Sequence, residues 1–213
     1  MNKLTSILKF YILTFVIFCN FNANANNALD SLLNDLKKQK QDTSQIKTLF
    51  EIVDLLINEK NPDAKKYAAQ AYEKSLLVPG TKYFNQAVSL FLSTIEKDQT
   101  QNQKFQFLDK LLMNTYNDYA KKSILYMYKS LMLEGIDSNI KAANIYELAS
   151  QAALKSKDTL TIIDVFTSKG IFYKRKSNNT LALEALITAL RYSEYSEYND
   201  GIFPICINLG TIY

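Results

Sequence analysis

The sequence predicts an all-α fold in which antiparallel helix pairs stack as a solenoid behind an N-terminal signal peptide. The main observation is a pattern of small and large apolar residues that returns after forty positions. It aligns Ala142, Tyr146 and Ala149 with Ala182, Leu186 and Ala189. The turns keep this register, because polar residues interrupt the chain at the equivalent positions 137–139 and 177–179. Two further residues of this pattern, a glycine and a tyrosine, also return: Gly170 and Tyr173 as Gly210 and Tyr213.

Helical periodicity supports the same fold without reference to the repeats. Apolar residues follow a three-four spacing at Ile46, Leu49, Val53 and Leu56, and no segment shows sustained strand alternation. Turn-forming residues, such as those at 61–63, fall between the periodic segments. Three prolines and five glycines leave little room for a loop-rich domain. We therefore expect about nine or ten helices after the signal peptide.

The repeated residues resemble the tetratricopeptide repeat family, whose first helix carries Leu-Gly-x-x-Tyr and whose second helix carries alanines around a large apolar residue. The segment from Leu209 to Tyr213 fits the first helix. Gly170 and Tyr173 fit it too, although Lys169 stands where the family has an apolar residue. The resemblance implies a superhelix of helix pairs over residues 44–213.

One predicted unit departs from the family pattern. Residues 83–117 have the right length, but Gln103, Phe107 and Lys110 replace the expected alanine, large apolar residue and alanine. We interpret this segment as a divergent repeat. The predicted divisions are a signal peptide (1–25), a helical cap (26–43), four units (44–80, 83–117, 119–157 and 159–199) and a truncated unit (202–213).

The first 25 residues have the features of a secretory signal. Lys3 and Lys9 give a basic start, residues 10–19 form a short apolar run, and Ala23 and Ala25 form a small-residue cleavage site. The run is short for a membrane span, which needs about 20 apolar residues. Cleavage after Ala25 is favoured over an uncleaved anchor or lipidation at the leader's cysteine. The expected location is periplasmic or extracellular in a bacterium.

Charge argues against nucleic acid as a partner of this region. Loss of the leader lowers Lys plus Arg from 25 to 23, against 21 Asp plus Glu, so the mature chain is nearly neutral. A nucleic-acid binder usually carries a basic patch. Here the lysines occur in short, scattered groups typical of solvated helix faces.

The residues for most catalytic mechanisms are missing from the sequence. There is no histidine, which excludes Ser-His and Cys-His pairs and histidine metal sites. Phosphate-binding and nucleophile-elbow motifs are also missing. After leader cleavage Cys206 is alone, and its apolar neighbours favour a packed, unreactive side chain. We expect no enzyme activity, no cofactor and no metal.

The resemblance implies that a partner binds the concave face, lined by the first helix of each unit. The forty-residue register then nominates inward residues in rows. These are Met127, Thr167 and Ile207 in one row, Leu131, Ile171 and Thr211 in a second, and Glu134 and Lys174 at the rim. Because the rows are mixed and mainly apolar, we expect an extended or helical apolar peptide or protein rather than a bound terminal carboxylate.

The chain stops at Tyr213, inside an expected first helix, which indicates a fragment of a longer protein. The main hypothesis is an exported interaction module, the truncated N-terminal input region of an envelope sensor or regulator. The alternative is a self-contained periplasmic or secreted scaffold for envelope assembly. An uncapped last repeat favours self-association. Membrane attachment would need an anchor beyond Tyr213.

Overall fold

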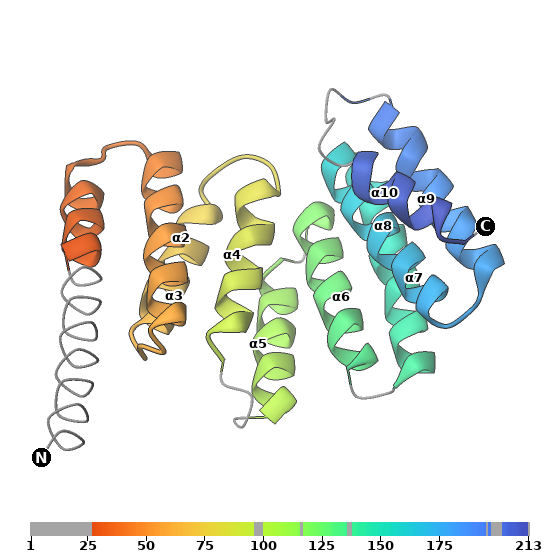
Figure 1. Ribbon diagram of the computed structural model, residues 1–213, viewed down its shortest axis with the longest axis horizontal. Coiled ribbons are helices and arrows are strands. Elements are labelled where there is room, and N and C mark those ends of the chain that lie inside the picture. Colours follow the sequence, from red (N-terminus) through yellow and green to blue (C-terminus); the bar gives the residue numbers. More distant parts are fainter. Residues whose placement is uncertain are drawn as a thin grey trace, which may run out of the picture. The chain divides into compact units, whose positions relative to one another are not determined.

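The computed structural model describes residues 27–95, 100–115, 117–135, 138–194, 196 and 202–212 (Figure 1). Their regular structure is helical throughout, with no strand in these ranges, which confirms the predicted all-α class. The chain divides into two compact units, residues 1–78 and 79–213. The signal peptide predicted over residues 1–25 lies outside the described residues.

The first unit contains a helical segment over residues 27–38, then α2 (Asp42–Asn58) and α3 (Ala64–Ser75). α3 approaches α2 closely because Ala64, Ala68 and Ala71, at most 4% exposed, form a stripe of small residues. The segment 27–38 lies within the predicted cap. It packs four leucines against the cluster of Ile52, Leu56 and Ala64, namely Leu29, Leu32, Leu33 and Leu36.

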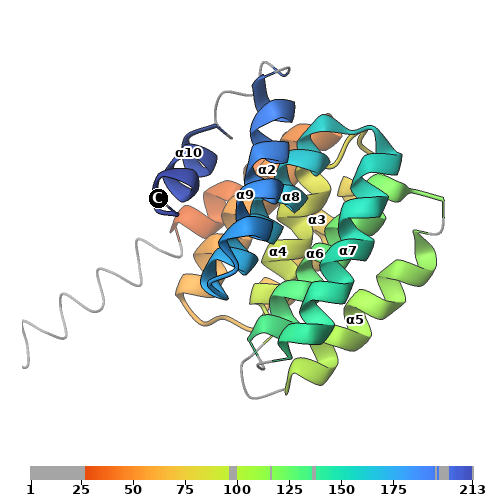
Figure 2. The ribbon, with the colours of Figure 1, turned by 90° about the vertical axis from the view of Figure 1, so that its right-hand side faces the viewer.

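The second unit contains three helix pairs and one further helix. They are α4 (Lys82–Ser93) with α5 (Thr100–Asn114), α6 (Tyr119–Glu134) with α7 (Asn139–Ser156), α8 (Thr159–Arg175) with α9 (Asn179–Glu194), and α10 (Ile202–Gly210). Figures 1 and 2 show α6 and α7 side by side, and α8 packs on α9 in the same way. Helix pairs therefore follow one another along the chain, as the predicted solenoid of helix pairs requires.

The forty-residue register corresponds to close contacts between these helices. A Cβ atom placed on Gly170 would lie 2.5 Å from Cγ of Leu186, so α8 and α9 meet where the side chain is missing. Tyr146 is fully buried on α7, with its ring centroid 5.2 Å from that of Phe172 on α8. The alanines of the pattern are buried as well: Ala142, Ala149, Ala182 and Ala189. The divergent pair uses a different contact, because Phe91 on α4 stacks on Phe107 of α5 with centroids 4.1 Å apart.

Polar residues end and start the helices where the sequence places turns. The carboxylate of Asp118 accepts a hydrogen bond from the Lys121 amide at the start of α6. The side chain of Asn178 accepts one from the Leu181 amide at the start of α9. Ser177, just before it, has a left-handed backbone with φ of 56°. The corresponding turn residue Asp137 lies outside the described residues.

Candidate functional site

The first helices of the three pairs, α4, α6 and α8, border an open hollow of about 330 Å³. Polar side chains predominate among the residues that line it: Thr81, Lys82, Asn85, Gln86, Ser89, Tyr128, Leu160 and Asp164. Asn85 and Ser89 are four residues apart, and therefore share one face of α4. The hollow lies on the helices where the sequence placed a binding face, but its lining is more polar than the expected apolar groove.

A chain of hydrogen bonds crosses the hollow from one helix to the next. Ser89 on α4 bonds to the phenol of Tyr128 on α6. The Tyr128 hydroxyl donates to Oδ1 of Asn85 at 2.7 Å. Nδ2 of Asn85 then donates to Oδ2 of Asp164 on α8 at 2.8 Å. The chain ends on a carboxylate and joins α4 to α8, two pairs apart in the fold.

A second polar contact joins the same two helices at the start of α8. Oδ2 of Asp158 accepts hydrogen bonds from Thr81 at 2.7 Å and from Thr161 at 2.6 Å. The two threonine oxygens lie 2.8 Å apart. Thr81 and Thr161 are both buried, so these hydroxyls need the partners that they find here.

Burial changes the acidity of two side chains that line the hollow, Asp164 and Tyr128. Burial raises the pKa of Asp164 to about 6; the Asn85 hydrogen bond lowers this pKa, and the charge of Asp158 raises it. Burial also raises the pKa of Tyr128 to about 12. At neutral pH the hollow therefore contains an ionised carboxylate whose charge is only partly stabilised.

The residues nominated from the sequence differ in their exposure. Met127 is buried, and its Sδ lies 3.3 Å from the Ser168 hydroxyl. Leu131, Thr167 and Ile171 are partly buried, and the buried Oγ1 of Thr167 has no hydrogen-bond partner among the residues that the structure describes. By contrast, two of the nominated residues are exposed, namely Ile207 and Thr211.

Both nominated rim residues take part in bonds between repeats. The Glu134 side chain is 8% exposed; it accepts a hydrogen bond from Tyr146 at 2.9 Å and lies 3.3 Å from Arg175. The Lys174 ammonium donates to Asn208 at 2.7 Å and to Thr211 at 2.8 Å, which ties α8 to α10. These contacts join neighbouring helices, and neither side chain lines the hollow between α4, α6 and α8.

None of the residues nominated from the sequence is among those that line the hollow, so its central residues Asn85, Tyr128 and Asp164 were all missed. Asp164 stands one helical turn before the nominated Thr167, so extension of the nominated rows by one turn would have found it. Tyr128 directly follows the nominated Met127 in the sequence. Asn85 had no such signal, because residues 83–117 do not keep the forty-residue register.

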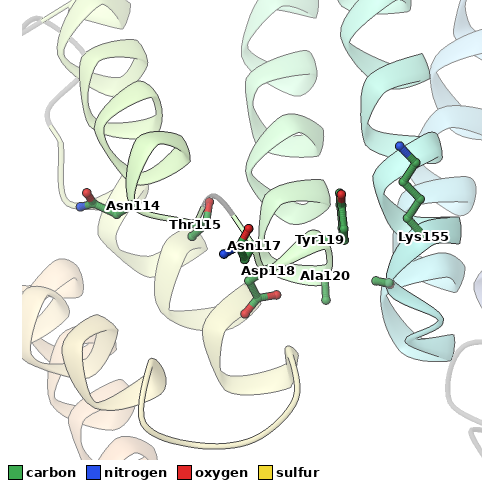
Figure 3. A pocket seen from close by; sticks show the side chains of 8 residues that line it. Asn114, Thr115, Asn117, Asp118, Tyr119, Ala120 and Lys155 are labelled. Carbon is green, nitrogen blue, oxygen red and sulfur yellow. The ribbon is translucent and has the colours of Figure 1, made fainter.

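Figure 3 shows a second, larger hollow, of about 590 Å³, at the turn between α5 and α6 and the last turn of α7. The Lys155 ammonium lies 5.6 Å from the centroid of the Tyr119 ring, a cation–π contact. Asp118 points away from Lys155, and its carboxylate is 3.0 Å from the Lys121 ammonium. The polar groups here mainly lie at helix ends, where they have a structural role. The hollow between α4, α6 and α8 is therefore the better candidate for a binding site.

The sequence expectation for Cys206 was wrong. We expected a packed side chain, but Cys206 is exposed, whereas its neighbour Ile205 is buried. Successive residues of a helix point about 100° apart, so one apolar run places these two side chains on different faces. Across the described ranges, no three His, Cys, Asp or Glu side chains are grouped so that they could hold a metal ion. None of the described helices is long and apolar enough to cross a membrane.

Comparisons with known proteins bear on the fold alone. No family model matches the sequence, and no curated protein matches it. Among solved structures, the chain is similar to the crystal structure of BtubC (BKLC) from P. vanneervenii, with a TM-score of 0.58 and 13% sequence identity. The match covers 90% of this chain and 81% of that one. At this identity the likeness shows that both chains share a helical architecture.

Proposed function

We propose that this chain is an exported interaction module that binds a peptide or protein partner on the face formed by α4, α6 and α8. The observation that carries the proposal is the open hollow in this face, to which helices of three different pairs contribute polar side chains. A partner laid across three helices contacts all of them at once, as ligands of helical repeats do on their concave surfaces.

The chemistry of the hollow supports binding over catalysis. Its hydroxyl and amide groups bond to one another or to a carboxylate, and the sequence has no histidine to act as a base. The Thr81 hydroxyl donates to the Asp158 carboxylate, but it is buried and shares this acceptor with Thr161, which favours a structural role over that of a nucleophile. The ordered polar groups instead offer directional contacts to a ligand.

The tetratricopeptide resemblance and the leader suggest where such a module acts. We propose that the repeats belong to that family and that residues 1–25 direct export to the periplasm or beyond. The input region of an envelope sensor and a self-contained scaffold both use a repeat surface of this kind. Sequence downstream of Tyr213 distinguishes them: about 20 apolar residues followed by a signalling module indicates the sensor.

Peptide selection tests the binding proposal. A phage library of random dodecapeptides is selected on the purified chain, and the most enriched peptide is synthesised with a fluorescein label. Ser89→Trp fills the hollow and is expected to weaken binding of this peptide at least tenfold in fluorescence anisotropy. Ser93→Trp, one turn further along α4 and also exposed, is the matched control and should change affinity less than twofold. Failure to enrich any peptide, or equal loss in both variants, contradicts the proposal.

A further inference from the structure

The chain of hydrogen bonds in the hollow runs toward Asp164 and leaves acceptor positions of its carboxylate unused within the described residues. Ser89, Tyr128 and Asn85 pass their hydrogen bonds in one direction, toward Asp164. Such a chain is polarised, so each bond strengthens the next. Within the described residues, Asp164 receives one hydrogen bond, at Oδ2, although a carboxylate has about four acceptor positions. The remaining capacity of this carboxylate can be used by a donor from outside.

The hollow also has negative charge that no neighbouring cation balances in the described part of the chain. Asp164 on α8 bonds to Asn85, and Asp158, just before α8, bonds to Thr81 beside the hollow; across the described ranges neither carboxylate forms an ion pair. Lys82 lines the hollow, yet it makes no ion pair with Asp164 either. An ionised, partly buried carboxylate without a neighbouring cation is destabilising, because no Coulomb attraction offsets the free-energy cost of its desolvation.

We propose that the hollow between α4, α6 and α8 receives the basic side chain of the peptide partner and that Asp164 binds its guanidinium or ammonium group. This inference rests on the proposed function. A cation satisfies both deficits, because it donates hydrogen bonds and carries the opposite charge. Leu160 supplies an apolar wall along which the aliphatic stem of an arginine or lysine can lie.

The test uses the labelled dodecapeptide from the phage selection. Its sequence is expected to contain arginine or lysine, and replacement of that residue by the neutral isostere citrulline, or by norleucine, should weaken binding at least tenfold. Asp164→Asn keeps an oxygen for Asn85 but removes the charge. It should abolish the difference between the basic and neutral peptides. Asp54→Asn removes the same charge from an exposed position on α2 and should leave the difference intact.

The pH dependence of the unaltered protein provides a second measurement that needs no variant. The titratable groups that line the hollow are Asp164, Tyr128 and Lys82, and Asp158 lies beside it, bonded to Thr81. Asp164 titrates near pH 6, so the affinity of the basic peptide should fall at least fivefold from pH 7.5 to pH 5. The citrulline peptide should change less than twofold over this range.

The outcomes separate the two proposals. If no peptide is enriched, the binding face itself is wrong, and the inference falls with it. A peptide that binds at Ser89 but is enriched without basic residues overturns the inference and leaves the binding face standing. The same holds if citrulline binds as well as arginine, or if Asp164→Asn preserves the preference for charge.

Discussion

Gly170 sets the separation of α8 and α9 by its lack of a side chain. Its position is closed by Leu186 and by the carbonyl oxygen of Ala182, 3.3 Å from where a Cβ would stand. Gly210 occupies the equivalent place in the forty-residue register, and none of the described atoms outside its own stretch of helix lies within 4 Å of its Cβ position. The same residue type therefore has a packing role at one site and no packing partner at the other.

This pair gives a matched test of the register. Gly170→Ala should destabilise the fold, since overpacking costs about 1 to 3 kcal/mol against a gain of about 1 kcal/mol in helix propensity. Gly210→Ala meets no neighbour and should be neutral or slightly stabilising. Urea midpoints of both variants and the parent measure the effect. Equal shifts in both would show that Gly170 is not a close-contact position.

The charge of Asp164 lowers the stability of the protein without ligand. Its folded pKa, raised by burial from 3.8 to about 6, means that the folded chain holds a proton that the unfolded chain releases between these values. Stability should therefore fall as pH rises from about 4 to about 6 and then level off, by on the order of 2 to 3 kcal/mol.

Asp164→Asn should remove this dependence. The variant is expected to be more stable than the parent at pH 8 and equal to it near pH 4, as measured by urea unfolding at several pH values. Asp54→Asn, at an exposed position, should follow the parent throughout. A parent curve that rises with pH over this range would contradict the assigned environment of Asp164. Residues that reduce stability in this way are frequently kept for binding.

At the scale of helices, the sequence predicts helix pairing best where small residues at the interface set the distance between the two helices. Ala142 and Ala149 on α7, and Ala182 and Ala189 on α9, are buried as their spacing indicates. α4 and α5 escaped this reasoning because a stacked pair of rings, not a small residue opposite a large one, holds them together. The site was missed for a related reason: its polar residues meet across helices from different pairs, which local periodicity does not report.

The helical segment 27–38 covers the apolar side of the first unit. Replacement of both Leu32 and Leu36 by alanine should lower the stability of this unit by about 1 to 3 kcal/mol, because part of their apolar surface is buried against α2. Hydrogen exchange of the α2 amides should become faster. Alanine at Asp30 and Lys37, both exposed on the same segment, is the control. Unchanged exchange in the leucine variant would show that the segment does not support α2.

At the scale of the molecule, the division at residues 78 and 79 coincides with an exposed connection. Leu77 is 73% exposed, and Gly80 has a positive φ of 81°.

Limited proteolysis should therefore start in this connection. Thermolysin is expected to cut before Leu77 and to leave a fragment over residues 77–213 that keeps its helical circular dichroism. Leu154, 46% exposed but inside α7, is the internal control and should resist cleavage. Mass spectrometry identifies the first product. Initial cleavage within α6 to α9 would contradict the division into two units.

The bonds between α4 and α8 also bear on the order of folding. They join residues 77 to 80 apart in sequence, whereas pairs such as α6 and α7 meet across a short turn. Closure of a long loop costs more chain entropy than formation of a local hairpin, so we expect these bonds to form after the pairs have assembled. They are equally expected to open first, while every pair stays folded. A local opening of these bonds would widen the access to Asp164 at a free-energy cost far below that of global unfolding.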